Sequence, residues 1–144
     1  MDYQQVNNYL TSIFNNVLVV EESSLRGSRF NDVSIKEMHT MDVIGAHPGA
    51  TPSHVARELM VTLGTVTTSL NNLERKGYIE RKRSQTDRRV VHLNLTSKGR
   101  LLYRLHTRFH RRLVERIIKG MSEEEVVVMG KGLQNLYHFL EDLK

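Results

Sequence analysis

The stretch from Thr62 to Leu95, TLGTVTTSLNNLERKGYIERKRSQTDRRVVHLNL, decides the fold predicted for this chain. Thr62 suits a helix N-cap and Gly77 suits the position just after a helix, so a helix is expected between them. Its apolar residues fall on one side at helical spacing; they are Leu63, Val66, Leu70 and Leu73. The other side is small and polar, with Gly64, Thr65, Thr68, Asn72 and Arg75 pointing outward and Asn71 at the flank.

Two short strands are predicted after this helix. Apolar residues alternate with polar ones on both sides of a loop from Ser84 to Arg88. Ile79 lies before this loop, and Val91, Leu93 and Leu95 lie after it. Basic residues gather on this hairpin: Arg81, Lys82, Arg83, Arg88 and Arg89. Upstream, Thr51-Pro52 opens a short helix, and Met60-Val61 forms the turn before Thr62. Two helices joined by a short turn and followed by a basic β-hairpin predict a winged helix-turn-helix.

This layout makes double-stranded DNA the expected partner. Hydroxyl and amide side chains can hydrogen-bond base edges in the major groove or the phosphates beside it. The residues expected there are Thr62, Gly64, Thr65, Thr68, Asn71, Asn72 and Arg75. Arg88 and Arg89 are expected in or beside the minor groove, where the potential is most negative, and Arg83 is a further candidate for DNA contact. Asp87 is expected to fix the loop by accepting hydrogen bonds or pairing with a neighbouring arginine. The alternative is an ordinary solvated face, which would normally carry more Lys and Glu.

Long amphipathic helices are predicted at both ends of the chain. Apolar residues at helical spacing predict a helix over residues 3 to about 22, followed by a loop from Ser23 to Val33. Capping boxes at Ser34 with Glu37 and at Ser122 with Glu125 start two others, and Thr96 starts a long helix that Gly120 closes. The fold class is thus mainly α with a small β-wing: residues 34–96 form the winged domain, and 1–33 and 97–144 form a helical dimerisation region. The apolar stripes of the end helices favour a homodimer on a palindromic operator, and a monomeric helical subdomain is the alternative.

Composition narrows the classes of function. The net charge of +5 permits binding to a polyanion. The absence of cysteine excludes disulfides and thiol chemistry and suits a reducing cytoplasm. No apolar run approaches the roughly 20 residues of a membrane span, and the N-terminus lacks a signal-peptide pattern. There is no phosphate-binding glycine loop or nucleophile elbow, so an enzyme is not expected.

The hairpin also carries a family resemblance. The run from Asp87 to Gly99, DRRVVHLNLTSKG, is similar to the D-x-R…L-T-x-x-G wing pattern of MarR-type transcriptional regulators, and LNNLERKGYIER resembles the end of their recognition helix. Within the family, Leu25 to Phe30 and Thr62 to Arg81 resemble repressors of bacterial type II fatty-acid synthesis. That resemblance implies repression of fatty-acid synthesis genes, with long-chain acyl-acyl carrier protein as corepressor.

Two sets of residues would serve such a corepressor. An acyl chain needs an apolar slot, for which the candidates are Phe14, Val17, Leu25, Met38, Met41, Leu102, Leu105 and Phe109; each is otherwise an ordinary core residue. Arginines recur every four residues from Arg100 to Arg116, and Arg104, Arg108, Arg111 and Arg112 are the candidates for contact with the acidic carrier protein. The alternative is a solvated charged face.

A zinc-responsive regulator is the competing interpretation. His106 and His110 are four residues apart on one helix face, a spacing that can hold one metal ion. The family resemblance implies that His39 and Glu21 or Glu22 lie nearby, as in zinc-responsive members. No cofactor is otherwise expected.

Overall fold

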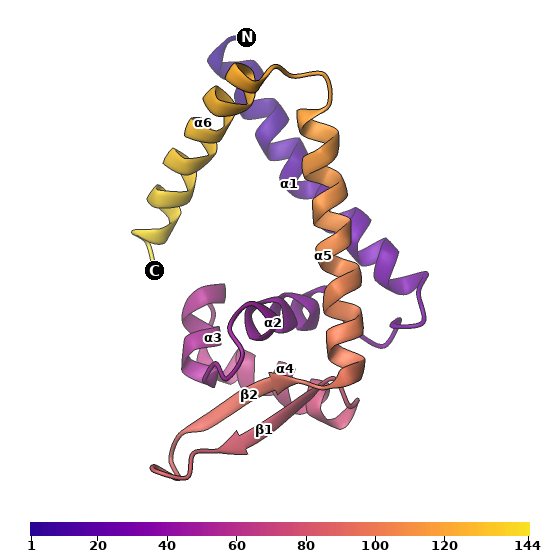
Figure 1. Cartoon of the computed structure of the whole chain (residues 1–144), viewed down its shortest axis with the longest axis vertical. Helices are drawn as coiled ribbons and strands as arrows, with labels where there is room; N and C mark the ends of the chain where they lie inside the picture. Colours follow the sequence, from indigo (N-terminus) through magenta and orange to yellow (C-terminus); the bar gives the residue numbers. More distant parts are fainter.

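The computed structural model describes all 144 residues, as six helices and one two-stranded antiparallel sheet (Figure 1). The helices are α1 (Tyr3–Arg26), α2 (Ile35–Ala46), α3 (Pro52–Leu59), α4 (Leu63–Arg75), α5 (Ser97–Ile118) and α6 (Glu123–Glu141); strands β1 (Ile79–Arg83) and β2 (Val91–Leu95) lie between α4 and α5. Helices α2 to α4 and the sheet form one body, from which α5 rises with α1 crossing it (Figure 1). The predicted fold class, mainly α with a β-wing, is confirmed.

The predicted helix starts are confirmed by their hydrogen bonds. Each N-cap side chain accepts a bond from the backbone N–H three residues later; the caps are Ser34, Thr51, Thr62, Thr96 and Ser122. These bonds satisfy backbone donors that the first turn of a helix leaves unpaired. Gly77 follows α4 with φ +82°, a left-handed conformation that glycine adopts without strain.

The core lies where α2, α3 and α4 meet the sheet. Its fully buried side chains are Met38, Met41, Ile44, Val55, Val66, Leu70, Leu73, Tyr78, Ile79 and Leu93. Ile79 pairs with Leu95 and Arg83 with Val91 across the sheet, and Ala50 adds a single bridge to Leu93 on the other edge of β2. The wing is therefore anchored at its base and free at its tip.

Tyr78 joins the wing to α5 and to the loop after α1. Its hydroxyl donates to Asp32 Oδ1 at 2.6 Å, and its carbonyl accepts from Thr96 N at 3.0 Å. Burial, followed by the hydrogen bond and charge of Asp32, raises the pKa of Tyr78. Gly99 of α5 packs so closely on the Tyr78 carbonyl that a Cβ there would lie 2.1 Å from the oxygen. Only glycine fits this junction without displacement.

Two predictions were wrong: the end of helix α1 and the direction of the Leu63 side chain. Ser23 and Ser24 continue α1 to Arg26 instead of starting a loop, because Glu21 and Leu25 on the same face are both buried against the body. Leu63, expected to point inward, is 50% exposed, whereas Val66 is 1% exposed. Helical side chains tilt toward the N-terminus, so a residue in the first turn projects beyond the start of its helix.

The end helices leave apolar surface uncovered. No residue of α6 is buried, and its exposed side chains include Leu133, Tyr137 and Phe139. Most large apolar residues of α1, such as Ile13 and Phe14, are also exposed. Lys144, just beyond α6, pairs with Glu58 of α3 at 3.0 Å. None of the six helices combines the length and apolar character needed to cross a membrane.

Candidate nucleic-acid interface and ligand pocket

Helix α4 presents a polar outward face. Thr65, Thr68 and Asn71 are exposed there, as are Thr62, Gly64 and Arg75, while Asn72 is half-buried. Asn72, which was expected to point outward, is thus less exposed than Asn71, which was expected at the flank and lies beside β1. Their side-chain oxygens both accept from arginine: Arg81 Nη2 lies 2.9 Å from Asn71 Oδ1, and Arg75 Nη2 lies 3.1 Å from Asn72 Oδ1.

The wing loop is organised by Asp87, as predicted. Asp87 accepts from the backbone N–H of Arg89 at 3.0 Å and from its Nε at 3.2 Å. The backbone bond first, and the side-chain bond second, hold the pKa of Asp87 below its ordinary value. Arg89 is 92% exposed and Arg88 is also exposed, while Arg83 Nη1 donates to the Arg88 carbonyl at 3.4 Å. An ordered hairpin thus offers cationic side chains at its tip.

Sequence reasoning did not single out Arg81 as a site residue. Its side chain lies on the sheet face that packs on α4, where it also contacts Glu74 Oε1 at 3.2 Å. The alternation of strands carried a signal for this position, because Arg81 is two residues after the buried Ile79 and so shares its face.

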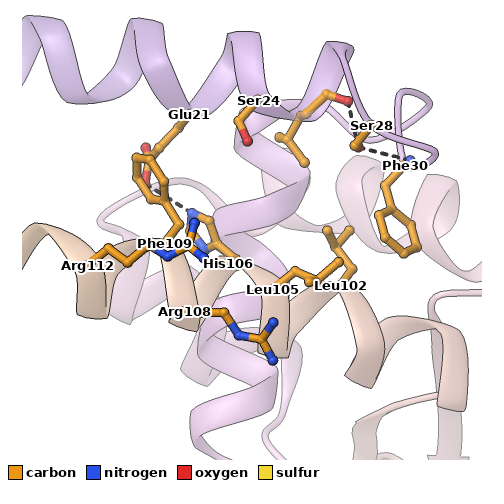
Figure 2. Close-up of a pocket in the computed structure, with 11 residues that line it drawn as sticks. Glu21, Ser24, Ser28, Phe30, Leu102, Leu105, His106, Arg108, Phe109 and Arg112 are labelled. Atoms are coloured by element: carbon orange, nitrogen blue, oxygen red, sulfur yellow. Dashed lines mark hydrogen bonds and ion pairs between the residues drawn. The ribbon is translucent and has the colours of Figure 1, made fainter.

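A cavity of about 280 Å³ lies between α1 and α5. Figure 2 shows Glu21 and Ser24 reaching toward it from α1, and Leu105, His106 and Phe109 from α5. The complete lining is Glu21, Ser24, Leu25, Ser28, Phe30, Leu102, Leu105, His106, Arg108, Phe109 and Arg112. Five of the eleven lining residues are apolar; the others are the serines of α1 and the loop after it, Glu21 with His106, and two arginines on α5.

Half of the predicted slot residues lie in this cavity. Leu25, Leu102, Leu105 and Phe109 line it. Met38 and Met41 do not, because both are fully buried in the core of the winged body. Phe14 and Val17 also lie outside the lining, and Phe14 is exposed earlier on α1. Phe30 was missed; it reaches the cavity through the loop that follows α1.

The predicted arginine stripe does not form one surface. A step of four residues advances 400° around a helix, so arginines at this spacing drift by about 40° each time. Arg108 and Arg112 line the cavity beside α1, whereas Arg100 and Arg104 line a separate groove against the sheet. Arg111 pairs with Glu115 at 3.0 Å within α5. Of the four arginines predicted to contact a carrier protein, Arg108 and Arg112 therefore share a site.

Three predicted metal-ligand candidates converge: Glu21 and His106 line the cavity, and His110 lies beside them outside its lining. Glu21 Oε1 lies 3.0 Å from His106 Nε2 and 2.7 Å from His110 Nε2, and one potential ligand atom from each residue falls within 4.8 Å of the others. His39 Nε2 is 3.5 Å from Glu21 Oε2. Zinc ligands about 2.0–2.2 Å from a tetrahedral ion stand roughly 3.3 Å from one another. The Glu21 carboxylate and the two imidazoles are closer than this because they are hydrogen-bonded, so they would have to separate by roughly 0.3–0.6 Å to hold the ion.

Asp42, which sequence reasoning missed, completes the surroundings of His106. Its Oδ1 lies 2.9 Å from His106 Nδ1. Burial opposes a charge on His106, but the hydrogen bonds and charges of Asp42 and Glu21 outweigh it and raise the pKa of the imidazole. His106 thus connects α5 to both α1 and α2.

The helix-turn-helix, its exposed polar helix and the basic wing define a winged helix-turn-helix DNA-binding protein. The MarR family model matches residues 31–90. The Bacillus subtilis HTH-type transcriptional regulator YfiV is 30% identical over 114 residues, which cover 78% of this chain and 71% of YfiV. The chain belongs to the MarR family of transcriptional regulators; it binds DNA and is not an enzyme.

Solved DNA complexes agree with this assignment. The chain is similar to Streptococcus pneumoniae FabT in complex with DNA, with 77% identity, 99% of this chain and 100% of FabT covered, and a TM-score of 0.92. A DNA complex of Staphylococcus aureus MepR is 26% identical over 96% of each chain, with a TM-score of 0.75.

Proposed function

We propose that this protein is a cytoplasmic homodimeric repressor of fatty-acid biosynthesis genes, with long-chain acyl-acyl carrier protein as its corepressor. The observation that carries the proposal is the cavity between α1 and α5, which combines apolar walls with Arg108 and Arg112. The sequence motifs already resembled those of fatty-acid synthesis repressors, and the 77% identity to FabT supports the same proposal. An apolar slot suits an acyl chain, and guanidinium groups beside it suit an acidic carrier protein.

The dimer is supported by the uncovered apolar faces of α1 and α6. Exposed apolar side chains on long helices are typical of surfaces that another subunit covers. A two-fold dimer would place two α4 helices in successive major grooves and favour a palindromic operator. The proposed contacts of α4 in or beside the major groove are Thr62, Gly64, Thr65, Thr68, Asn71, Asn72 and Arg75. Arg88 and Arg89 would act in or beside the minor groove, Arg83 would add a further DNA contact, and Asp87 would hold the loop.

The proposed corepressor acts through the spacing of the two α4 helices. The cavity lies against α5, which joins the winged body at Gly99 and Tyr78. A ligand that favours one separation of α1 and α5 would favour one separation of the reading helices. A corepressor stabilises the separation that matches successive grooves, and binding of DNA and of corepressor then strengthen each other.

The test is a titration of DNA affinity at fixed salt with acyl-acyl carrier protein, free fatty acid and zinc in parallel. We expect only acyl-acyl carrier protein to raise the affinity. Exchanging Arg108 and Arg112 for Glu should abolish that increase while leaving basal DNA binding intact. Arg116→Glu is the matched control, because Arg116 is on the same helix but outside the cavity. An increase that survives in the double variant would refute the role of these arginines.

Zinc sensing is the second candidate, favoured by the Glu21, His106 and His110 cluster. These three residues would hold the ion, with His39 beside them. Metal analysis of protein purified without a histidine tag, together with DNA binding with and without zinc, tests it. We expect His110→Gln to abolish zinc binding, and the candidate fails if wild-type protein binds none.

A further inference from the structure

Arg81 of β1 contacts two side chains of α4, the helix proposed to contact DNA. This inference rests on the proposed contact between the outward face of α4 and the major groove. Arg81 is the third residue of β1 and its side chain is only 26% exposed, because it lies between the sheet and α4. One guanidinium nitrogen donates to Asn71 Oδ1 at 2.9 Å and another to Glu74 Oε1 at 3.2 Å. Glu74 therefore helps to hold the guanidinium beside Asn71.

The contact fixes the direction of the Asn71 amide. A guanidinium group has only donors, so the amide oxygen and not its NH2 group must face Arg81. The NH2 group then points away from Arg81, on a side chain that is exposed. The Asn72 amide is oriented in the same way, because its oxygen accepts a hydrogen bond from Arg75 at 3.1 Å. Both asparagines keep their oxygens on arginine and their donors free.

We propose that Arg81 is a specificity-determining positioning residue, which makes Asn71 a hydrogen-bond donor toward the major groove. The usual pairing of asparagine with adenine is bidentate and uses both the amide oxygen and the NH2 group. With its oxygen engaged, Asn71 instead suits the acceptor edge of guanine, which offers O6 and N7, or thymine O4. Arg81 thereby shapes base preference without contacting a base itself.

The experiment is selection of bound sequences from randomised duplexes by full-length wild type, Asn71→Ala, Arg81→Ala and Lys82→Ala. Lys82→Ala is the matched control, because it removes one positive charge from the next residue of β1, whose side chain is on the opposite face of the strand. We expect Asn71→Ala to lose discrimination at one position in each half-site. Arg81→Ala should change the preference at that same position, with adenine gaining on guanine on the order of tenfold. Lys82→Ala should select the same bases as wild type.

Arg81→Met, which keeps the aliphatic stem and removes the donors, should reproduce the change if Arg81→Ala lowers stability. Unaltered base preference in both Arg81 variants, with affinity lowered equally for all sequences, would overturn the inference and leave the α4 contact standing. If Asn71→Ala changes no position, the proposed contact of Asn71 with DNA fails and the inference fails with it. Position-specific loss in Asn71→Ala and a base exchange in the Arg81 variants support both.

Discussion

Replacing Gly99 by alanine should destabilise the protein, although alanine is the better helix former. The added Cβ would lie 2.1 Å from the Tyr78 carbonyl oxygen, 3.1 Å from its carbon and 3.4 Å from Leu95 Cβ. An ordinary carbon–oxygen contact is about 3.3 Å, so α5 and the start of β1 must separate by roughly 1.2 Å. The oxygen cannot turn aside, because it accepts the Thr96 N–H at 3.0 Å.

The size of the effect follows from two opposing contributions. Overpacking of this kind costs about 1–3 kcal/mol, whereas replacing glycine by alanine inside a helix gains about 0.5–1 kcal/mol. The net loss should be about 1–2 kcal/mol, or roughly 3–7 °C in the melting temperature of a chain this long. Thermal unfolding followed by circular dichroism at one protein concentration measures it, since dimer stability depends on concentration.

Gly64→Ala is the matched control for this measurement. Gly64 also lies in a helix, but the nearest atom to an added Cβ is Thr62 Oγ1 at 4.0 Å. We expect Gly64→Ala to melt at or slightly above the wild-type temperature. If Gly99→Ala is as stable as Gly64→Ala, the close packing of α5 on Tyr78 does not hold.

Three further outcomes are expected. Gly64→Ala should lower DNA affinity several-fold despite its unimpaired stability, because the new methyl group stands on the face proposed to approach DNA; equal affinity in a fluorescence-anisotropy titration would remove Gly64 from the interface. Arg89→Ala should weaken DNA binding for all sequences and make its salt dependence shallower by roughly one unit of slope, with the melting temperature unchanged; unchanged affinity at moderate salt would count against the wing contact. Glu21→Gln should lower stability by about 1.5–3 kcal/mol in urea with chelator present, since the buried carboxylate accepts from His106 and His110; an unshifted urea midpoint would show that these bonds contribute nothing.

Local signals in the sequence predicted the elements well. A helix start depends on one side chain and a backbone N–H three residues later, so Ser34, Thr62 and Ser122 could be recognised without knowing the rest of the fold. The strand alternation that ends at Leu95 is similarly local. Tertiary packing decided the rest: burial of Leu25 extended α1 past two serines, and the tilt of first-turn side chains left Leu63 exposed.

The site was less predictable because it joins residues far apart in sequence. Asp42 and His106 are 64 residues apart, and their contact depends on how α2 packs on α5. The spacing of four residues predicted that the arginines of α5 share one surface. They lie on two surfaces instead, because an α-helix has 3.6 residues per turn. Met38 and Met41 have the chemistry of pocket residues but point into the core.

The two candidate effector sites share a wall. Glu21 and His106 line the cavity proposed for an acyl chain and also belong to the cluster proposed for zinc. His110 belongs only to the cluster, and Leu105 only to the cavity. A change at Glu21 would therefore disturb both sites and could not distinguish them. His110→Gln should affect a metal response alone, and Leu105→Trp, which fills the cavity, an acyl response alone. If only one of these two variants abolishes the effect of the effector on DNA affinity, that variant identifies the ligand that binds between α1 and α5. If both variants abolish it, zinc and the acyl chain act on one coupled site.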